Sequence, residues 1–231
     1  MSEERPEEEV MRLTLNERLQ HLALMVCVLV LMVTGLALRY ADTWLGRGII
    51  ALEGGMEARG LLHRVASLGL MLLWLYHAGY VVFTRRGHDQ LMEILPCRQD
   101  LRDLGALLRQ NLGGRGAPPR FGRFDFRQKF QYWAVALGVT AMVPTGFLLW
   151  FESQAMAALP KWIMDLARVV HSGEGLVIFL VLFLWHLYDT HLRPEVFPMD
   201  QSWLTGRMSR KQWQERHARE YEETGREEEK G

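Results

Sequence analysis

The sequence predicts an all-α integral membrane protein: a bundle of four transmembrane helices with both termini in the cytoplasm. Charged residues make up 23% of the 231 residues, yet they are segregated along the chain. Four stretches of about membrane-spanning length contain no Lys, Arg or Asp. None has the polar stripe typical of a helix in a soluble bundle. These stretches are residues 19–38, 65–83, 130–151 and 169–188.

The distribution of basic residues predicts the orientation. With four spans, the N-terminus, the loop at 84–129 and the tail from 193 lie on one side and hold three, ten and eight Lys/Arg. The segments on the other side hold six. Because segments rich in Lys and Arg stay in the cytoplasm, we expect both termini there. The charge runs are typical of solvated faces, and none indicates nucleic-acid binding.

An acidic cytoplasmic N-terminus, a transmembrane domain and a cytoplasmic tail are expected in turn. The N-terminus has no basic region ahead of an apolar core, so it does not resemble a signal peptide. Between spans two and three, leucines on one face of 101–112 predict a short helix at the membrane interface or against a partner. Ser209 begins a capping-box pattern that predicts a solvated helix in the tail. The segments are 1–18, 19–190 and 191–231, with spans at about 19–38, 61–83, 129–151 and 168–190.

Spans one and three look like copies of one another. The segment "QHLALMVCVLVLMVTGLAL" at 20–38 aligns without a gap on "QYWAVALGVTAMVPTGFLL" at 131–149. Spans two and four then each begin with a histidine and carry another near the opposite end. Two matched hairpins indicate a pseudo-symmetric bundle. The alignment places two Thr-Gly pairs at the same depth, Thr34-Gly35 and Thr145-Gly146.

Four histidines lie in the second and fourth spans, where an ionisable side chain is costly and usually functional. His63 and His77 are fourteen residues apart, which is a rise of about 21 Å and nearly four whole turns of helix. Both rings therefore leave the same face. His171 and His186 are fifteen residues apart and again share roughly one face.

The pairing of these histidines by depth predicts two b-type haems between the helices. His63 and His171 lie near the outer surface, whereas His77 and His186 lie near the inner one. Two imidazoles at one depth on facing helices are the axial ligands of a haem. Zinc usually needs three or four clustered ligands. With two cysteines and no C-x-x-C-H motif, neither covalent haem nor an iron–sulfur cluster is expected.

Longer segments resemble a known family. They are "ERLQHLALMVCVLVLMVTG", "RQKFQYW", "VPTGFLLW", "HSGEGLVIFLVLFLWHLY" and, in the tail, "TGRMSRKQWQERHAREY". The chain is similar to the membrane cytochrome b (gamma) subunit of respiratory formate dehydrogenases. Related subunits serve nickel–iron hydrogenases and thiosulfate reductases. The resemblance implies two haem b, menaquinone or ubiquinone as substrate, the inner membrane of a prokaryote, and an iron–sulfur or multihaem cytochrome subunit as partner.

The resemblance also implies a ligand set. Its outer haem is held by His63 and His171, as above. Its inner haem is held by His186 and by the histidine that opens the first span, His21. The internal repeat instead pairs His186 with His77, so both alternatives stay open.

Two further assignments depend on the resemblance. The family's quinone pocket lies beside the inner haem near the start of span three, which implies Asp125, Gln128 and Lys129, with His186 at its wall. His191 departs from the family pattern, and a third haem that uses the spare histidines is a minor alternative.

The sequence therefore predicts an electron-transfer and quinone-reacting subunit of an oxidoreductase complex. One alternative is a stand-alone transmembrane haem reductase. Another is a membrane anchor without redox activity, whose histidines relay protons. An absorption spectrum separates the last alternative from the first two, and co-purification with a redox partner separates those two.

Overall fold

The computed structural model describes residues 9–114, 119–194 and 196–228. The chain divides into two compact units, each built from segments that are distant in the sequence. We call them the membrane unit, which comprises Leu19–Gly79 and Trp133–Met199, and the polar unit, which comprises Met1–Arg18, Tyr80–Tyr132 and Asp200–Gly231. Of the acidic N-terminus expected at 1–18, residues 1–8 lie outside the described part.

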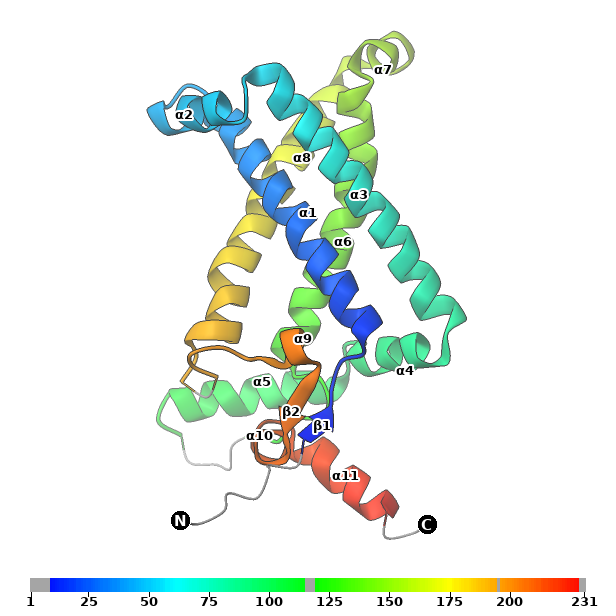
Figure 1. Ribbon diagram of the computed structural model, residues 1–231, viewed down its shortest axis with the longest axis vertical. Coiled ribbons are helices and arrows are strands. Elements are labelled where there is room, and N and C mark those ends of the chain that lie inside the picture. Colours follow the sequence, from blue (N-terminus) through cyan, green and yellow to red (C-terminus); the bar gives the residue numbers. More distant parts are fainter. Residues whose placement is uncertain (1–8, 115–118, 195, 229–231) are drawn as a thin grey trace. The chain divides into compact units, whose positions relative to one another are not determined.

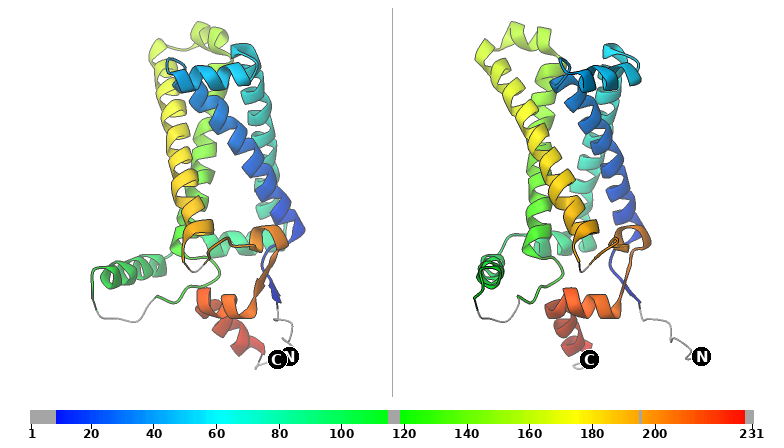
Figure 2. Two further views of the ribbon diagram at one scale, coloured as in Figure 1. Left: turned by 60° about the vertical axis from the view of Figure 1, so that its left-hand side comes forward. Right: turned by 90° about the vertical axis from the view of Figure 1, so that its left-hand side faces the viewer.

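Long apolar helices make up the membrane unit. In the described part of the chain, four helices are long and apolar enough to cross a membrane, the last one counted through to Leu192. Figures 1 and 2 show their stretches within the membrane unit running side by side. The predicted helical fold with four apolar helices is thereby confirmed. The helices are α1 (Leu15–Arg39), α3 (Met56–Phe83), α6 (Phe126–Trp150) and α8 (Lys161–Leu180).

The fourth long helix changes its winding halfway along. After α8 the chain continues as the π-helical turns η1 (Val181–His186) and η2 (Tyr188–Leu192). The sequence predicted one uniform α-helix here, since apolar periodicity does not distinguish the two windings. Short π-helical turns inside α-helices occur frequently at functional sites, and η1 ends at one of the histidines.

In the membrane unit, one short helix follows α1 and another follows α6. They are α2 (Trp44–Leu52) and α7 (Glu152–Ala158). The hydroxyl of Thr43 accepts a hydrogen bond from the Gly46 amide at 3.1 Å and so caps the N-terminus of α2. Both helices lie at the same end of the unit (Figures 1 and 2).

One face of α3 presents a continuous apolar stripe. Leu61, Val65, Leu68, Leu72 and Leu75 recur at spacings of four and three residues, which places them on one side of the helix. Their side chains are between 43% and 68% exposed. An apolar surface of this length would be unfavourable in water, so it is suited to lipid.

The polar unit contains the remaining elements. Strands β1 and β2 pair antiparallel, with Glu9 opposite Ser209 and Met11 opposite Arg207. The pairing joins segments from opposite ends of the chain. The elements are β1 (Glu9–Met11), α4 (Arg85–Ile94), α5 (Arg98–Asn111), α9 (Ser202–Thr205), β2 (Arg207–Ser209), α10 (Arg210–Arg216) and α11 (Ala218–Glu228).

Gly206 forms the turn between α9 and β2. Its φ of +79° is unfavourable for residues with a side chain. Its carbonyl oxygen accepts hydrogen bonds from the amides of Arg12 and Leu13 at 2.8 and 3.1 Å. A Cβ atom here would lie 2.6 Å from the Leu13 carbonyl oxygen, so only glycine allows this close approach.

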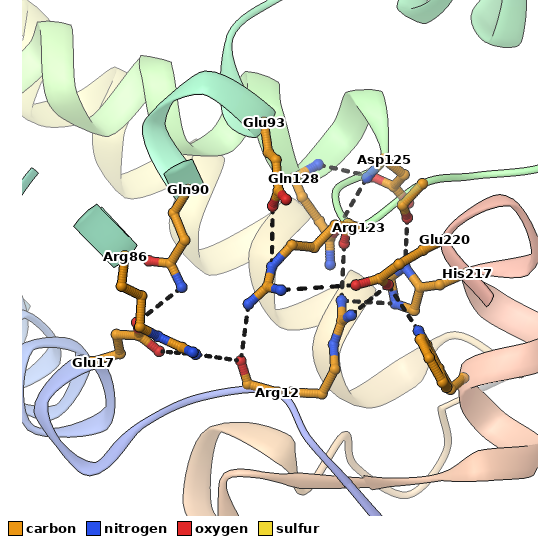
Figure 3. Close-up of polar contacts among 12 residues, drawn as sticks. Arg12, Glu17, Arg86, Gln90, Glu93, Arg123, Asp125, Gln128, His217 and Glu220 are labelled. Atoms are coloured by element: carbon orange, nitrogen blue, oxygen red, sulfur yellow. Dashed lines mark hydrogen bonds and ion pairs between the residues drawn. The ribbon is translucent and has the colours of Figure 1, made fainter. Parts of the chain in front are cut away.

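Buried charges hold the polar unit together (Figure 3). Arg12 is 9% exposed and pairs with Glu220 at 2.6 Å. Arg12 also donates to the carbonyl oxygen of Arg123 at 2.9 Å, and Arg123 pairs with Glu93 at 3.2 Å. Removing one member of the buried Arg12–Glu220 pair should cost about 3–5 kcal/mol, because its partner would be left buried and unpaired.

The local predictions for this unit have different outcomes. Ser209 caps α10 by accepting from the Gln212 amide at 3.3 Å, as predicted. The leucine-rich segment is helical as α5. The expectation that the helix after Ser209 is solvated is wrong for part of it, because His217 is only 4% exposed. The tail packs into the polar unit because β2 pairs with β1 and Glu220 forms an ion pair with Arg12.

Candidate functional site

Two histidines of the membrane unit face each other at a distance suited to one shared metal ion. The ring centroids of His63 on α3 and His171 on α8 are 6.3 Å apart, with 64° between the ring planes. A metal bound to one nitrogen of each ring at about 2 Å, with the ring centre about 1 Å further on, separates the centres by roughly 6 Å. The pair predicted for the outer side therefore has the spacing of two axial ligands.

A second pair has nearly the same spacing. The ring centroids of His21 on α1 and His186 at the end of η1 are 6.2 Å apart, with 49° between the planes. The Nδ1 atom of His77 lies 2.8 Å from the side-chain oxygen of Gln20. The structure thus brings His186 together with His21, the partner that the family resemblance implied. It gives His77, the partner that the repeat implied, a hydrogen bond with Gln20.

The two histidine pairs lie at different levels along the helices. His21 belongs to one pair, and Thr34, thirteen residues further along α1, contacts His63 of the other. Thirteen residues of α-helix rise about 20 Å. The arrangement therefore provides two separate sites, one near each end of the unit.

Threonine hydroxyls orient His63 and His171. The Oγ1 atom of Thr34 lies 2.8 Å from Nδ1 of His63, and that of Thr145 lies 3.1 Å from Nδ1 of His171. Each hydroxyl also contacts a carbonyl oxygen one turn back in its own helix, Val30 at 2.7 Å and Ala141 at 2.8 Å. The Nδ1 side of each ring is thus engaged, which leaves Nε2 as the atom for a ligand bond.

Glycines give the same two rings room. A Cβ atom at Gly35 would lie 3.6 Å from Cε1 of His63, and one at Gly146 would lie 3.1 Å from Cε1 of His171. The two Thr-Gly pairs of the internal repeat therefore contact equivalent histidines, His63 and His171.

The donor set fits a haem better than a metal ion held by protein alone. Within the described residues, no group of three or more His, Cys, Asp or Glu is placed to hold a metal ion. Tetrahedral zinc sites need three or four protein ligands. A haem needs only two axial ligands, because the porphyrin provides the other four nitrogens. The two imidazole pairs therefore fit this group.

The residues predicted for a quinone lie in the polar unit at the start of α6. The Oδ1 atom of Asp125 accepts from the amides of Arg127 and Gln128, both at 2.9 Å. The side-chain oxygen of Gln128 accepts from the Asp125 amide at 3.0 Å, which completes a reciprocal cap. Figure 3 shows these two side chains beside the ion-pair network.

Lys129 is also engaged locally. Its ammonium group lies 3.1 Å from Asp100, and it donates to the carbonyl oxygen of Leu95 at 3.2 Å. The Sγ atom of Cys97 is 3.7 Å away. Asp125 and Lys129 thus have clear structural roles, whatever further part they take.

Sequence reasoning missed the polar partners of the histidines. The repeated Thr-Gly pairs were visible as a repeat, but a repeat does not reveal which side chain each threonine contacts. Gln20 gave no signal, because a glutamine at the edge of a span is common.

Four apolar helices with histidines paired across them are the features of a membrane cytochrome b. Residues 12–191 match the family model described as Prokaryotic cytochrome b561, and the chain belongs to this family. It is also similar to the cytochrome b556 subunit of formate dehydrogenase from Haemophilus influenzae. The two are 21% identical over 209 residues, which cover 89% of this chain and 79% of that relative. The resemblance seen in the sequence is thereby confirmed, and haem b is the cofactor that the family implies.

Proposed function

We propose that this chain is a di-haem b-type cytochrome subunit that transfers electrons between a peripheral redox subunit and the membrane quinone pool. The proposal rests on two pairs of histidines at two levels of the membrane unit. The ring centroids are 6.3 Å apart in the His63–His171 pair and 6.2 Å apart in the His21–His186 pair. When bound, haem b supplies one-electron exchange at its iron.

The histidines hold and separate the two centres. His63 and His171 would hold one haem, and His21 and His186 would hold the other. The apolar helices around them exclude water, and they set two redox centres at different depths. His77 is engaged with Gln20 at 2.8 Å, which favours His21 over His77 as the inner ligand. The His21–His186 site is taken as the inner one because it lies toward the end of the spans that joins the N-terminus, the loop at 84–129 and the tail. These segments hold most of the basic residues, which places them in the cytoplasm.

The partner of this subunit carries its own redox centres. With two cysteines, the chain lacks the four thiolates of an iron–sulfur cluster. The Haemophilus relative is named as one subunit of a formate dehydrogenase. By this analogy, electrons pass between the chain and an iron–sulfur or multihaem cytochrome subunit in the inner membrane of a prokaryote.

Quinone exchange is proposed at the cytoplasmic side, where Asp125, Gln128 and Lys129 begin the third span. A quinone carbonyl needs a hydrogen-bond donor, and the side-chain NH₂ group of Gln128 and the ammonium of Lys129 are donors. Protons are exchanged with the same side. Menaquinone and ubiquinone present the same carbonyl chemistry, so either suits this site.

Single histidine variants with a quinol as reductant test the proposal. His63→Ala should lose one of two haems, and menadiol should still reduce the haem that is left. His186→Ala and His21→Ala should keep the other haem, but menadiol should no longer reduce it rapidly. The measurements are haem content and stopped-flow reduction in detergent, without oxygen.

His77→Ala is the matched control, and it should keep both haems and fast reduction. Loss of the inner haem in His77→Ala, with retention in His21→Ala, would reverse the ligand assignment. A wild-type protein that menadiol does not reduce would exclude the quinone reaction.

A further inference from the structure

We infer that Thr34 and Thr145 are positioning residues, each of which fixes the tautomer and the direction of one axial imidazole of the outer haem. The inference rests on the proposed function, because it concerns ligands of a haem. It assigns a purpose to the Thr-Gly repeat that the ligand set alone does not explain.

The proton of the Thr34 hydroxyl decides the direction of the hydrogen bond. The Oγ1 atom is 2.7 Å from the carbonyl oxygen of Val30, which has no proton to give. The hydroxyl has a single proton, so that contact uses it. The 2.8 Å contact between Oγ1 and His63 must then be a bond donated by Nδ1–H of the ring. This leaves the lone pair on Nε2, the form in which imidazole binds iron.

Thr145 repeats the same arrangement on the other ligand. Its hydroxyl donates to the carbonyl oxygen of Ala141 at 2.8 Å and accepts from Nδ1–H of His171 at 3.1 Å. The backbone of Met142 is a second hydrogen-bond partner of His171, so the effect of Thr145→Val should be smaller than that of Thr34→Val. Thr34 is only 2% exposed, so water does not readily replace its bond to the ring. Both axial rings of one site are therefore prepared as ligands before a haem arrives.

The backbone bond also fixes the hydroxyl in space. A threonine in a helix bonds the carbonyl oxygen four residues back in one side-chain rotamer, so Oγ1 has a fixed place on the helix surface. The following residue also differs between the copies, because a Cβ atom would crowd the ring at Gly146 but would make only an ordinary contact at Gly35. The threonine thus sets the direction of the hydrogen bond from the ring, and Gly146 leaves the space that His171 needs.

This arrangement has an electronic consequence. A hydrogen bond from Nδ1–H to an acceptor raises the basicity of the ring as a ligand. A more basic ligand favours ferric over ferrous iron. The two threonines should therefore lower the midpoint potential of the outer haem, and their removal should raise it.

The test replaces the hydroxyls without changing the volume. Valine has the shape of threonine but no hydroxyl, so Thr34→Val and Thr145→Val remove the acceptor. Serine retains it, so Thr34→Ser is the rescue variant. Thr140→Val is the matched control, because Thr140 makes the same bond to the carbonyl oxygen of Ala136 at 2.7 Å on an exposed face of α6.

Redox titration and haem transfer to apomyoglobin are the measurements. We expect each valine variant to raise the potential of one haem and leave the other unchanged. The double variant should raise it further. Haem should leave the altered site about 10-fold faster or more, as for other outer-sphere partners of metal ligands. Thr34→Ser and Thr140→Val should match the wild type.

The possible failures are distinguishable. A wild-type protein without haem overturns the proposed function, and this inference with it. A wild type with two haems, whose potentials are unchanged in both valine variants, overturns the inference alone. Equal shifts in Thr34→Val and Thr34→Ser would do the same, since they would assign the effect to packing instead of the hydroxyl.

Discussion

His217 is buried among charges in the polar unit and is held neutral there. Its Nδ1–H donates to the carbonyl oxygen of Gly122 at 2.8 Å, and Arg12 approaches its Nε2 at 3.4 Å (Figure 3). Burial, followed by the charge of Arg12, lowers the pKa of His217 to about 4. The unfolded ring has an ordinary pKa of about 6.5.

This difference predicts a loss of stability in mild acid. Between pH 6.5 and pH 4 the unfolded ring binds a proton that the folded ring does not, so stability falls as the pH falls through this window. The loss from His217 alone should be about 2 kcal/mol between pH 7 and pH 5. Denaturation in detergent at the two pH values measures it.

Two variants separate His217 from the other groups. His217→Gln should remove about this part of the pH dependence, because glutamine does not titrate. His88→Gln is the control, since its imidazole is exposed. Identical pH dependence in the wild type and His217→Gln would contradict the assignment.

Single residues also show the limits of sequence reasoning. His63, His171 and His186 could be selected because an ionisable residue in a span is unusual. His21 could not be derived from the repeat, which aligns it with Tyr132, and only the family resemblance selected it. A contact between two helices depends on their packing, which neither periodicity nor spacing specifies.

At the scale of elements, α1 and α6 are two versions of one supporting helix, and their glycines differ in clearance. A Cβ atom at Gly146 would be 3.1 Å from His171, whereas one at Gly35 would be 3.6 Å from His63. The first distance is shorter than an ordinary van der Waals contact, and the second is not. The ring beside Gly146 therefore has less room.

Alanine substitutions test this difference. Gly146→Ala should displace His171 and weaken haem binding at the His63–His171 site, seen as lower haem content after washing. Gly35→Ala should retain wild-type haem content. Both changes gain the same helix propensity, so the comparison isolates the contact with the ring. Equal haem loss in both variants would contradict this difference in clearance.

The spans could be predicted because an apolar run of this length is stable as a helix that crosses the hydrocarbon core of a membrane. The short strands β1 and β2 could not, because three residues from each end of the chain carry no usable periodicity. The π-helical turns after α8 were missed for a different reason, because apolar periodicity does not distinguish π-helical from α-helical winding. Elements such as β1 and β2, which form through contacts between distant segments, could not be predicted from local sequence patterns.

At the scale of the whole molecule, apolar and charged residues are divided between two units. The membrane unit contains the paired histidines and the apolar stripe of α3, whereas the polar unit contains buried ion pairs and the paired strands. The sequence predicted this segregation as a transmembrane domain with flanking segments. It did not predict that the N-terminal segment, the loop and the tail form one compact unit.

Two imidazole pairs should hold two haems, and the pyridine haemochrome assay on the purified wild-type protein counts them, with the protein amount determined by amino-acid analysis. About two non-covalent protohaems per chain are expected. In the absorption spectrum of the untreated protein both should be low-spin, because both axial positions are imidazole. A ratio near three would indicate a further site that uses His77 and His191. One haem per chain, or none, would exclude the two-haem ligand set.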